Sequence, residues 1–141
     1  MKIAVGCDHG GIEFKQMIIE FLQQIGQEPV DVGCFSHESV DYPDFAEKVC
    51  EQIAKGHCER GILICGTGLG MSIAANRHNH IRAALCHEAY TARMSREHNN
   101  ANVLCLGARV LGPEVALDVV GVWVETAFAG GRHQRRLDKM S

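Results

Sequence analysis

Short apolar segments recur along the whole chain and constrain its fold more than any other feature of the sequence. They are rich in valine, isoleucine and leucine, and they cover residues 3–7, 30–33, 61–65, 81–86 and 103–106. Each segment is nearly continuous in apolar residues instead of alternating between apolar and polar ones. This pattern is typical of strands that are buried on both faces of a parallel sheet.

Helix-length segments with a different periodicity separate these strands. The first repeats apolar residues at i, i+3, i+4 and i+7 from Phe14 onward and stops at Gly26. Further helices are predicted at about 42–55, 71–76, 88–98 and 113–128. Strands that alternate with helices over short links predict an α/β/α sandwich with a parallel sheet. Because the chain has no linker, repeat or low-complexity stretch, we expect residues 1–141 to form a single domain.

The overall charge argues against nucleic acid or a membrane as the main partner. The formal net charge is -3, and no apolar stretch approaches the ~20 residues that a spanning helix needs. The last ten residues are basic by contrast, so a small anion is the better candidate for a ligand. The basic side chains of this tail are Arg132, His133, Arg135, Arg136 and Lys139.

The cysteines indicate neither a disulfide framework nor a zinc site. There are seven of them, and no two are spaced as Cys-x-x-Cys. The chain also opens directly on a strand-like segment, without the pattern of a signal peptide. We therefore expect a cytoplasmic protein.

The loop Cys65-Gly66-Thr67-Gly68-Leu69-Gly70 carries the clearest chemical signal. It follows the third predicted strand, and ligands of open parallel sheets bind outside the carboxyl ends of the strands. Three glycines in five residues allow backbone N–H groups to turn toward an anion. The start of the next helix would also favour the thiolate form of Cys65.

Two familiar motifs do not fit this loop. A cysteine phosphatase needs an arginine six positions after the cysteine, where this chain has Met71. A dinucleotide-binding fold needs Gly-x-Gly-x-x-Gly, whereas the glycines here alternate as Gly-x-Gly-x-Gly. An anion-stabilising loop and a tight turn with a buried cysteine remain as alternatives.

Other polar residues follow the predicted strands and helices. Asp8 and His9 come after the first strand, Arg109 comes after the fifth, and His98-Asn99 closes the fourth helix. Each signal is weak alone, because such residues also cap helices or lie on the surface. The tail could also be a solvated segment. We favour a phosphate site, since arginines at i, i+4 on a helix form a fork that suits a phosphate.

The predicted helix at 113–128 has almost no polar stripe. A helix that is apolar all round must be covered on more than one side. The basic tail of the same chain could provide that cover. We favour the alternative, in which part of the helix packs against a second subunit.

Five motifs in order resemble the B-type ribose-5-phosphate isomerases, a family that includes allose- and galactose-6-phosphate isomerases. They are Gly-Cys-Asp-His-Gly-Gly (6–11), Asp-Tyr-Pro-Asp (41–44), Cys-Gly-Thr-Gly-Leu-Gly (65–70), Ser-Arg-Glu-His-Asn (95–99) and Gly-Gly-Arg-His (130–133). The resemblance implies a Rossmann-like sandwich with a five-stranded parallel sheet. It also implies a homodimer or a dimer of dimers, with active sites shared between two subunits.

The same resemblance implies an aldose–ketose isomerase that interconverts ribose 5-phosphate and ribulose 5-phosphate without a metal or other cofactor. Cys65 would move the proton between C2 and C1, and Thr67 with the amides of Gly66, Gly68 and Gly70 would hold the enediolate. His98 would open the sugar ring, assisted by Asp8. A branch of the family with serine and a later glutamate is excluded, because Leu69 occupies the glutamate position.

The remaining residues implied by the resemblance bind the substrate away from the reacting carbons. Asn99 would hold the sugar, and the phosphate would be bound by His9, Arg109, Arg132, His133 and Arg136. A hexose 6-phosphate isomerase is the nearest alternative, because pocket depth for one more carbon is not visible in a sequence. A non-catalytic sugar-phosphate sensor is the alternative outside enzymes, and it would not need Cys65.

Overall fold

Five parallel strands form one sheet in the order β2-β1-β3-β5-β4. The computed structural model describes residues 1–140, so Ser141 at the end of the expected domain lies outside the described residues. Each strand corresponds to one of the five apolar segments of the sequence. The strands are β1 (Lys2–Cys7), β2 (Glu28–Gly33), β3 (Arg60–Cys65), β4 (Ala83–Leu85) and β5 (Val103–Gly107).

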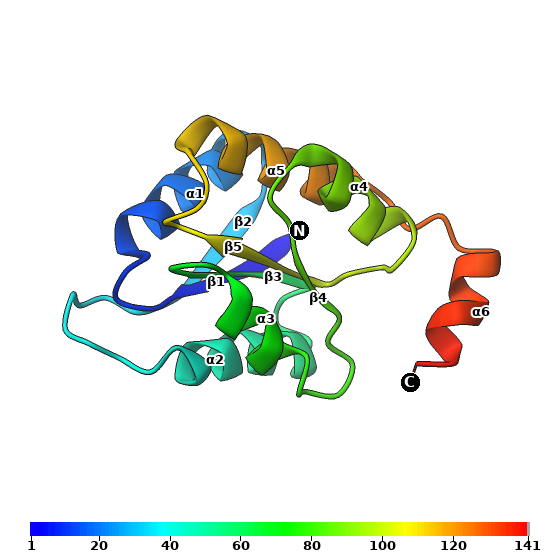
Figure 1. The fold of residues 1–141 in the computed structure, drawn as a ribbon, viewed down its shortest axis with the longest axis horizontal. Coiled ribbons are helices and arrows are strands. Elements are labelled where there is room, and N and C mark those ends of the chain that lie inside the picture. The colour runs from blue at the N-terminus through cyan, green and yellow to red at the C-terminus, as the bar shows by residue number, and fades with distance from the viewer. Residues whose placement is uncertain (141) are drawn as a thin grey trace.

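Helices cover both faces of this sheet (Figure 1). One layer contains α1 (Ile12–Gln24), α4 (Ala89–Glu97) and α5 (Pro113–Glu125), and the other contains α2 (Tyr42–Ala54) and α3 (Leu69–Ala75). A sixth helix, α6 (Arg132–Asp138), lies to the side of these layers. The predicted three-layer, Rossmann-like α/β/α sandwich is confirmed.

The central strands are buried on both faces, as their continuous apolar sequence predicts. Ile62 and Ile64 of β3 point into a core shared with α1 and α5, whereas Leu63 points into the core shared with α2 and α3. All three side chains are fully buried. The sheet is therefore rigid at its centre, and the loops at its edge are free to carry function.

Two boundaries and one additional helix differ from the predictions. The fourth strand is limited to Ala83–Leu85, because the backbone N–H of Arg82 before it donates to Asn102 Oδ1 (2.8 Å) and not to another strand. The fifth helix ends at Glu125, and Thr126 is already extended, with ψ 124°. α6 was not predicted as a separate helix, because its sequence is mostly polar and it buries only His133 and Leu137.

The apolar helix α5 is covered largely by its own layer and the sheet. It packs on α1, α4 and β5, and its Trp123 is fully buried under the Arg60 guanidinium, which lies 5.3 Å from the ring centroid. Within residues 1–140, the Trp123 indole Nε1 has no hydrogen-bond partner. Val115 on its outer side is 46% exposed, and packing of this side on a second subunit stays a prediction. No helix of the described chain is long and apolar enough to cross a membrane.

Candidate active site

Cys65 is the last residue of β3, at the carboxyl edge of the sheet. It pairs with Gly107 of β5, and it is 6% exposed. The backbone N–H of Gly68 donates to Cys65 Sγ at 3.1 Å. Gly68 adopts φ 80°, a left-handed conformation that glycine accepts without strain and that turns the loop back over the sulfur. A donor in this place stabilises negative charge on the sulfur.

The loop after Cys65 packs closely against its neighbours. A Cβ atom on Gly107 would lie 2.6 Å from the backbone oxygen of Thr67, and one on Gly70 would lie 2.5 Å from the Tyr42 ring. The Thr67 side chain is exposed, and its Oγ1 accepts the N–H of Leu69 at 3.2 Å. The path of the loop is therefore set by backbone packing, while its outer surface is open to a ligand.

Arg109 is attached to the same loop. Its backbone N–H donates to the Gly66 carbonyl at 2.9 Å, and the N–H of Ala108 donates to the Cys65 carbonyl at 2.9 Å. The Arg109 side chain passes over Gly66, where a Cβ atom would lie 3.5 Å from Arg109 Cδ. The exposed guanidinium of Arg109, which follows β5, therefore lies at the edge of the glycine loop.

Asp8 and His9 follow β1 beside this loop. The N–H of Asp8 donates to the Ile64 carbonyl at 3.1 Å, which places it next to Cys65 along the sheet edge. Asp8 Oδ1 accepts the N–H of Gly10 at 2.9 Å. His9 Nδ1 accepts the N–H of Val40 at 3.1 Å, so the proton of a neutral His9 is on Nε2 and available to a ligand.

These residues form what we call the proximal group. All of them lie at the carboxyl edge of the sheet, where the sequence predicted that reactive side chains would gather. The members are Asp8, His9, Cys65, Gly66, Thr67, Gly68, Gly70 and Arg109.

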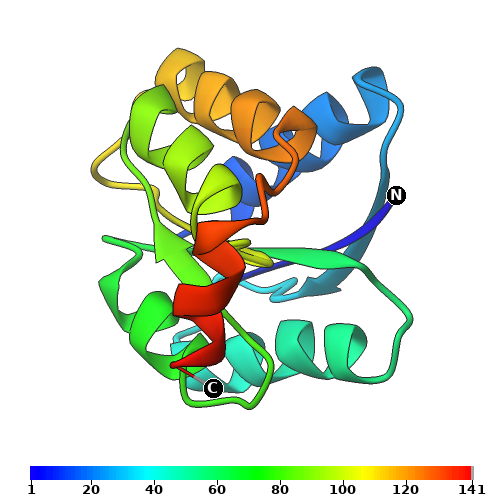
Figure 2. The ribbon, with the colours of Figure 1, turned by 90° about the vertical axis from the view of Figure 1, so that its right-hand side faces the viewer.

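The other predicted site residues lie elsewhere, and we call them the distal group: His98, Asn99, Arg132, His133 and Arg136. α4 starts after the carboxyl end of β4 and runs back along the sheet. His98 and Asn99 therefore lie in the turn that leads into the amino end of β5. α6 stands on the same side of the molecule, at the right of Figure 1 and across the front of Figure 2.

The distal group has two halves, the turn with His98 and Asn99 and the basic side chains of α6. Two stacked imidazoles bring these halves into contact. The rings of His98 and His133 have centroids 4.1 Å apart and an interplanar angle of 15°. Burial lowers the pKa of His133 below its ordinary value, and repulsion by His98, Arg132 and Arg136 lowers it further. Positive charge is thus concentrated here, in a place that an anion would stabilise.

One chain does not bring the two groups together. The distal group lies near Val103 at the start of β5, and the proximal group lies beside Gly107 at its end. A strand rises ~3.3 Å per residue, so this strand alone separates the groups by more than about 10 Å. A site containing both Cys65 and His98 would need the distal group of another copy.

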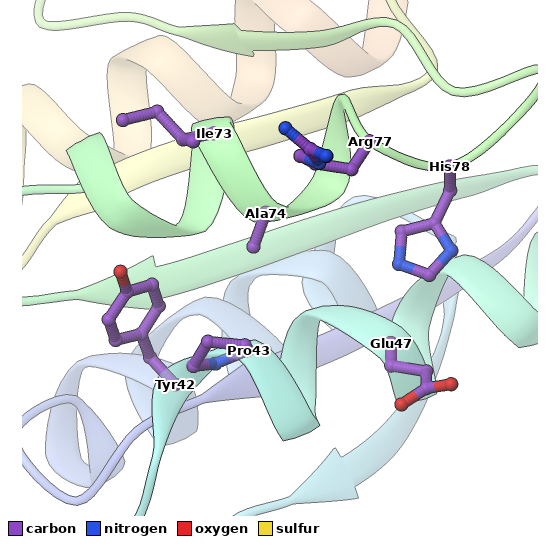
Figure 3. Close-up of a pocket in the computed structure, with 7 residues that line it drawn as sticks. All are labelled: Tyr42, Pro43, Glu47, Ile73, Ala74, Arg77 and His78. Atoms are coloured by element: carbon purple, nitrogen blue, oxygen red, sulfur yellow. The ribbon is translucent and has the colours of Figure 1, made fainter.

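A hollow lies between α2 and α3, next to the proximal group (Figure 3). It has a volume of about 420 Å³, with Tyr42 and Ile73 at one end and Glu47 and His78 at the other. Cys65 is not among its lining residues. Tyr42, which covers Gly70, received no role from the sequence, although it belongs to the Asp-Tyr-Pro-Asp motif. Among residues 1–140, no group of three or more His, Cys, Asp and Glu side chains is placed to hold a metal ion.

Comparison with known proteins gives consistent matches over the whole chain. A model of the family described as Ribose/Galactose Isomerase matches residues 3–140. Ribose-5-phosphate isomerase B of Escherichia coli is 47% identical over 140 residues, which cover 99% of this chain and 94% of that protein. D-erythrulose-4-phosphate isomerase of Pectobacterium atrosepticum is 43% identical over 141 residues, which cover 99% and 93%.

A solved structure gives the same picture of the fold. Ribose-5-phosphate isomerase B of Clostridium thermocellum superposes with a TM-score of 0.97 at 56% sequence identity. The superposition covers 99% of this chain and 95% of that chain. The likeness therefore includes the proximal and the distal group alike.

Proposed function

The chain belongs to the ribose/galactose isomerase family, and we propose that it interconverts D-ribose 5-phosphate and D-ribulose 5-phosphate through a cis-enediolate. The observation that carries this proposal is the Cys65 thiol itself. It lies at the carboxyl edge of the sheet with a backbone N–H 3.1 Å from its sulfur. In its thiolate form a cysteine at this position can act as a base at carbon, without any need for a metal or other cofactor.

In the proton transfer, the Cys65 thiolate removes the proton from C2 of the open-chain aldose. The electron pair of the C–H bond forms the C1–C2 double bond, and the carbonyl oxygen on C1 takes the negative charge. The thiol then returns a proton to C1, while the C2 hydroxyl becomes the ketone and its proton passes to O1. Thr67 and the amides of Gly66, Gly68 and Gly70 would stabilise the enediolate, where each fixed donor contributes roughly 2.7–4 kcal/mol in comparable sites.

The ring must open before this transfer, since ribose 5-phosphate is mostly a closed furanose. We assign ring opening to His98, which would donate a proton to the ring oxygen as the bond from C1 to that oxygen breaks. The C1 hydroxyl would lose its proton to solvent and become the aldehyde, and Asp8 would orient the sugar. Histidine suits this role because its ordinary pKa lies near neutrality. Asn99 would hold the sugar hydroxyls next to His98.

The phosphate would lie far from the reacting carbons, held by His9, Arg109 and the basic side chains of α6. Binding energy gained at this remote group can orient C1 and C2 against Cys65. Arg132, His133 and Arg136 belong to the distal group, so this assignment requires a second copy of the chain. We therefore propose a homodimer, alone or within a dimer of dimers, in which each site combines one proximal and one distal group.

The decisive variant is Cys65→Ala. We expect it to lower kcat at least ~100-fold while the affinity for ribose 5-phosphate stays near that of the wild type, because a general base acts on the transition state. Cys58→Ala is the matched control, since Cys58 is equally buried but lies just before β3, at the opposite edge of the sheet. Unchanged turnover in Cys65→Ala would refute the role of the thiol, and a wild type that binds the sugar without converting it would favour the sensor.

The substrate needs a separate measurement, because a relative at 43% identity carries the name of a four-carbon sugar phosphate isomerase. Steady-state assays would compare ribose 5-phosphate with erythrulose 4-phosphate, allose 6-phosphate and galactose 6-phosphate. We expect the largest kcat/KM for ribose 5-phosphate. A larger value for another sugar would replace the pentose assignment while leaving the isomerase mechanism in place.

A further inference from the structure

The turn that carries His98 and Asn99 is built around a buried arginine. Arg96 is only 5% exposed, although it lies in the last turn of α4. Its backbone carbonyl accepts the N–H of Asn100 at 3.2 Å. Asn100 has φ 46°, so the chain reverses here in a left-handed conformation.

The Arg96 guanidinium bonds two separate segments. Its Nη1 donates to the Ala101 carbonyl at 2.6 Å and to Asn100 Oδ1 at 3.0 Å, on the far side of the His98 turn. Its Nε donates to the Thr126 carbonyl at 3.2 Å, where α5 ends and the segment leading to α6 begins. One side chain therefore connects the turn of His98 with the base of the arm that carries Arg132, His133 and Arg136.

A second hydrogen bond connects the His98 turn to the segment that follows α5. The backbone N–H of Ala129 donates to the Glu97 carbonyl at 3.0 Å, one residue before His98. Next to these hydrogen bonds, the rings of His98 and His133 stack with centroids 4.1 Å apart. The spacing of the two halves of the distal group thus depends on contacts made by Arg96 and its neighbour.

Burial of this cation is costly. Arg96 has no salt bridge to a carboxylate within residues 1–140. Desolvation lowers its pKa to about 10, assisted by repulsion from Arg60 and Arg82. The side chain still carries its charge at neutral pH, and only backbone and amide oxygens compensate the loss of water. An apolar side chain would avoid this cost, so the guanidinium serves a purpose other than filling space.

We propose that Arg96 is a positioning residue, whose forked guanidinium sets the distance between the ring-opening group His98 and the phosphate-binding side chains of α6. This inference rests on the proposed function, because it assumes that His98 and α6 contact the same substrate. Lysine could not replace it, since one ammonium cannot bond the His98 turn and the Thr126 carbonyl with the same planar geometry.

Arg82 offers a matched control. Its Nε donates to the carbonyls of Asn99 at 3.0 Å and Asn100 at 3.2 Å, so it also holds the His98 turn. Within residues 1–140 it makes no hydrogen bond to the segment after α5, and it is only half-buried. Loss of Arg82 should therefore disturb the turn without displacing α6.

The test compares Arg96→Met, Arg96→Lys and Arg82→Met in assays with ribose 5-phosphate. We expect Arg96→Met to lower kcat and to raise KM, each at least ~10-fold, because both halves of the distal group shift. Arg82→Met should lower kcat with KM within about twofold. Arg96→Lys should keep the fold and still raise KM. If Arg96→Met does not fold, this variant alone tests whether the guanidinium positions the distal group.

Two kinetic results would overturn the inference: kinetic constants of Arg96→Lys equal to those of the wild type, or the same kcat and KM changes in Arg82→Met as in Arg96→Met. The His98 and His133 ring resonances provide a readout that does not depend on turnover, because ring-current shifts of stacked imidazoles should disappear in Arg96→Lys. Retention of those shifts would also overturn it. Failure of the proposed function is recognised separately, by a wild type that does not convert the sugar phosphate.

Discussion

The histidines of the two groups are prepared for different tasks. His9 has its Nδ1 occupied by the Val40 N–H, so its neutral ring donates from one defined nitrogen. His133 lies between an imidazole and two arginines in a buried place, where taking up a proton is unfavourable. A neutral His133 can still stack on His98, whereas an ionised one would repel the cations around it. A bound phosphate would reverse this balance by supplying negative charge.

The lowered pKa of His133 has a consequence for stability that can be measured. The unfolded chain binds a proton at the ordinary value of 6.5, whereas folded His133 does not until a lower pH. The free energy of unfolding must therefore decrease as the pH falls through the window just below 6.5. Between about pH 7.5 and about pH 5.5, Tm of the wild type should fall more than Tm of His133→Asn. His57→Asn, at an exposed position, should behave as the wild type, and equal slopes in all three proteins would contradict the assignment.

Among the elements, the end of β5 sets the position of the loop after Cys65, because its last residue, Gly107, has no side chain. Gly107 faces the backbone of Thr67, where a Cβ atom would lie 2.6 Å from the oxygen and 2.7 Å from the carbonyl carbon. Both atoms belong to the main chain, so no rotamer change can make room. The strand and the loop can approach this closely only because the residue is glycine.

Gly107→Ala should therefore displace the loop. We expect a loss of about 1–3 kcal/mol in the free energy of unfolding, as for other overpacked sites, together with a kcat at least ~10-fold lower. Gly121→Ala is the control, because its nearest neighbour, Phe21, would be at an ordinary distance of 3.5 Å. That variant should keep full activity and gain up to about 1 kcal/mol of stability from better helix propensity. A Gly107→Ala protein with wild-type kcat would show that the Thr67 backbone has freedom to move.

The elements themselves were largely predictable, and the exceptions have physical causes. Strands such as β3 can be predicted from the sequence, because burial on both faces requires an unbroken run of apolar residues. The edge strand β4 has weaker requirements, and hydrogen bonds of Arg82 and Asn102 shorten it in a way that no periodicity reveals. α6 is short and polar, so its helix depends on burying Leu137 and His133 against the rest of the molecule.

At the scale of the whole molecule, the proposed catalytic residues are divided between opposite edges of one sheet. The proximal group could be predicted as a cluster, because carboxyl ends of parallel strands meet at one edge. The place of His98 follows from a different rule: a helix between parallel strands returns to the amino edge, so its last residues lie away from Cys65. Motifs in a sequence show which residues act together but not which copy of the chain supplies them.

A mixing experiment tests this division. Cys65→Ala and His98→Ala should each be nearly inactive alone. In a two-fold dimer that exchanges subunits at random, half of the dimers are mixed, and each of these has one site with both residues intact. Activity should therefore recover to about a quarter of the wild-type value. If one chain formed the whole site, the mixture would be no more active than its components.

The only tryptophan of the chain lies beside the joint that Arg96 forms. The Trp123 carbonyl accepts a bond from Arg60 Nη1 at 3.0 Å, and the ring lies beneath the same guanidinium, three residues before Thr126. Its indole is fully buried, so its fluorescence emission is expected at short wavelength and should be sensitive to the position of that cation. Movement of the segment that follows α5 is therefore expected to change this signal, which offers an optical probe of the distal group without a label.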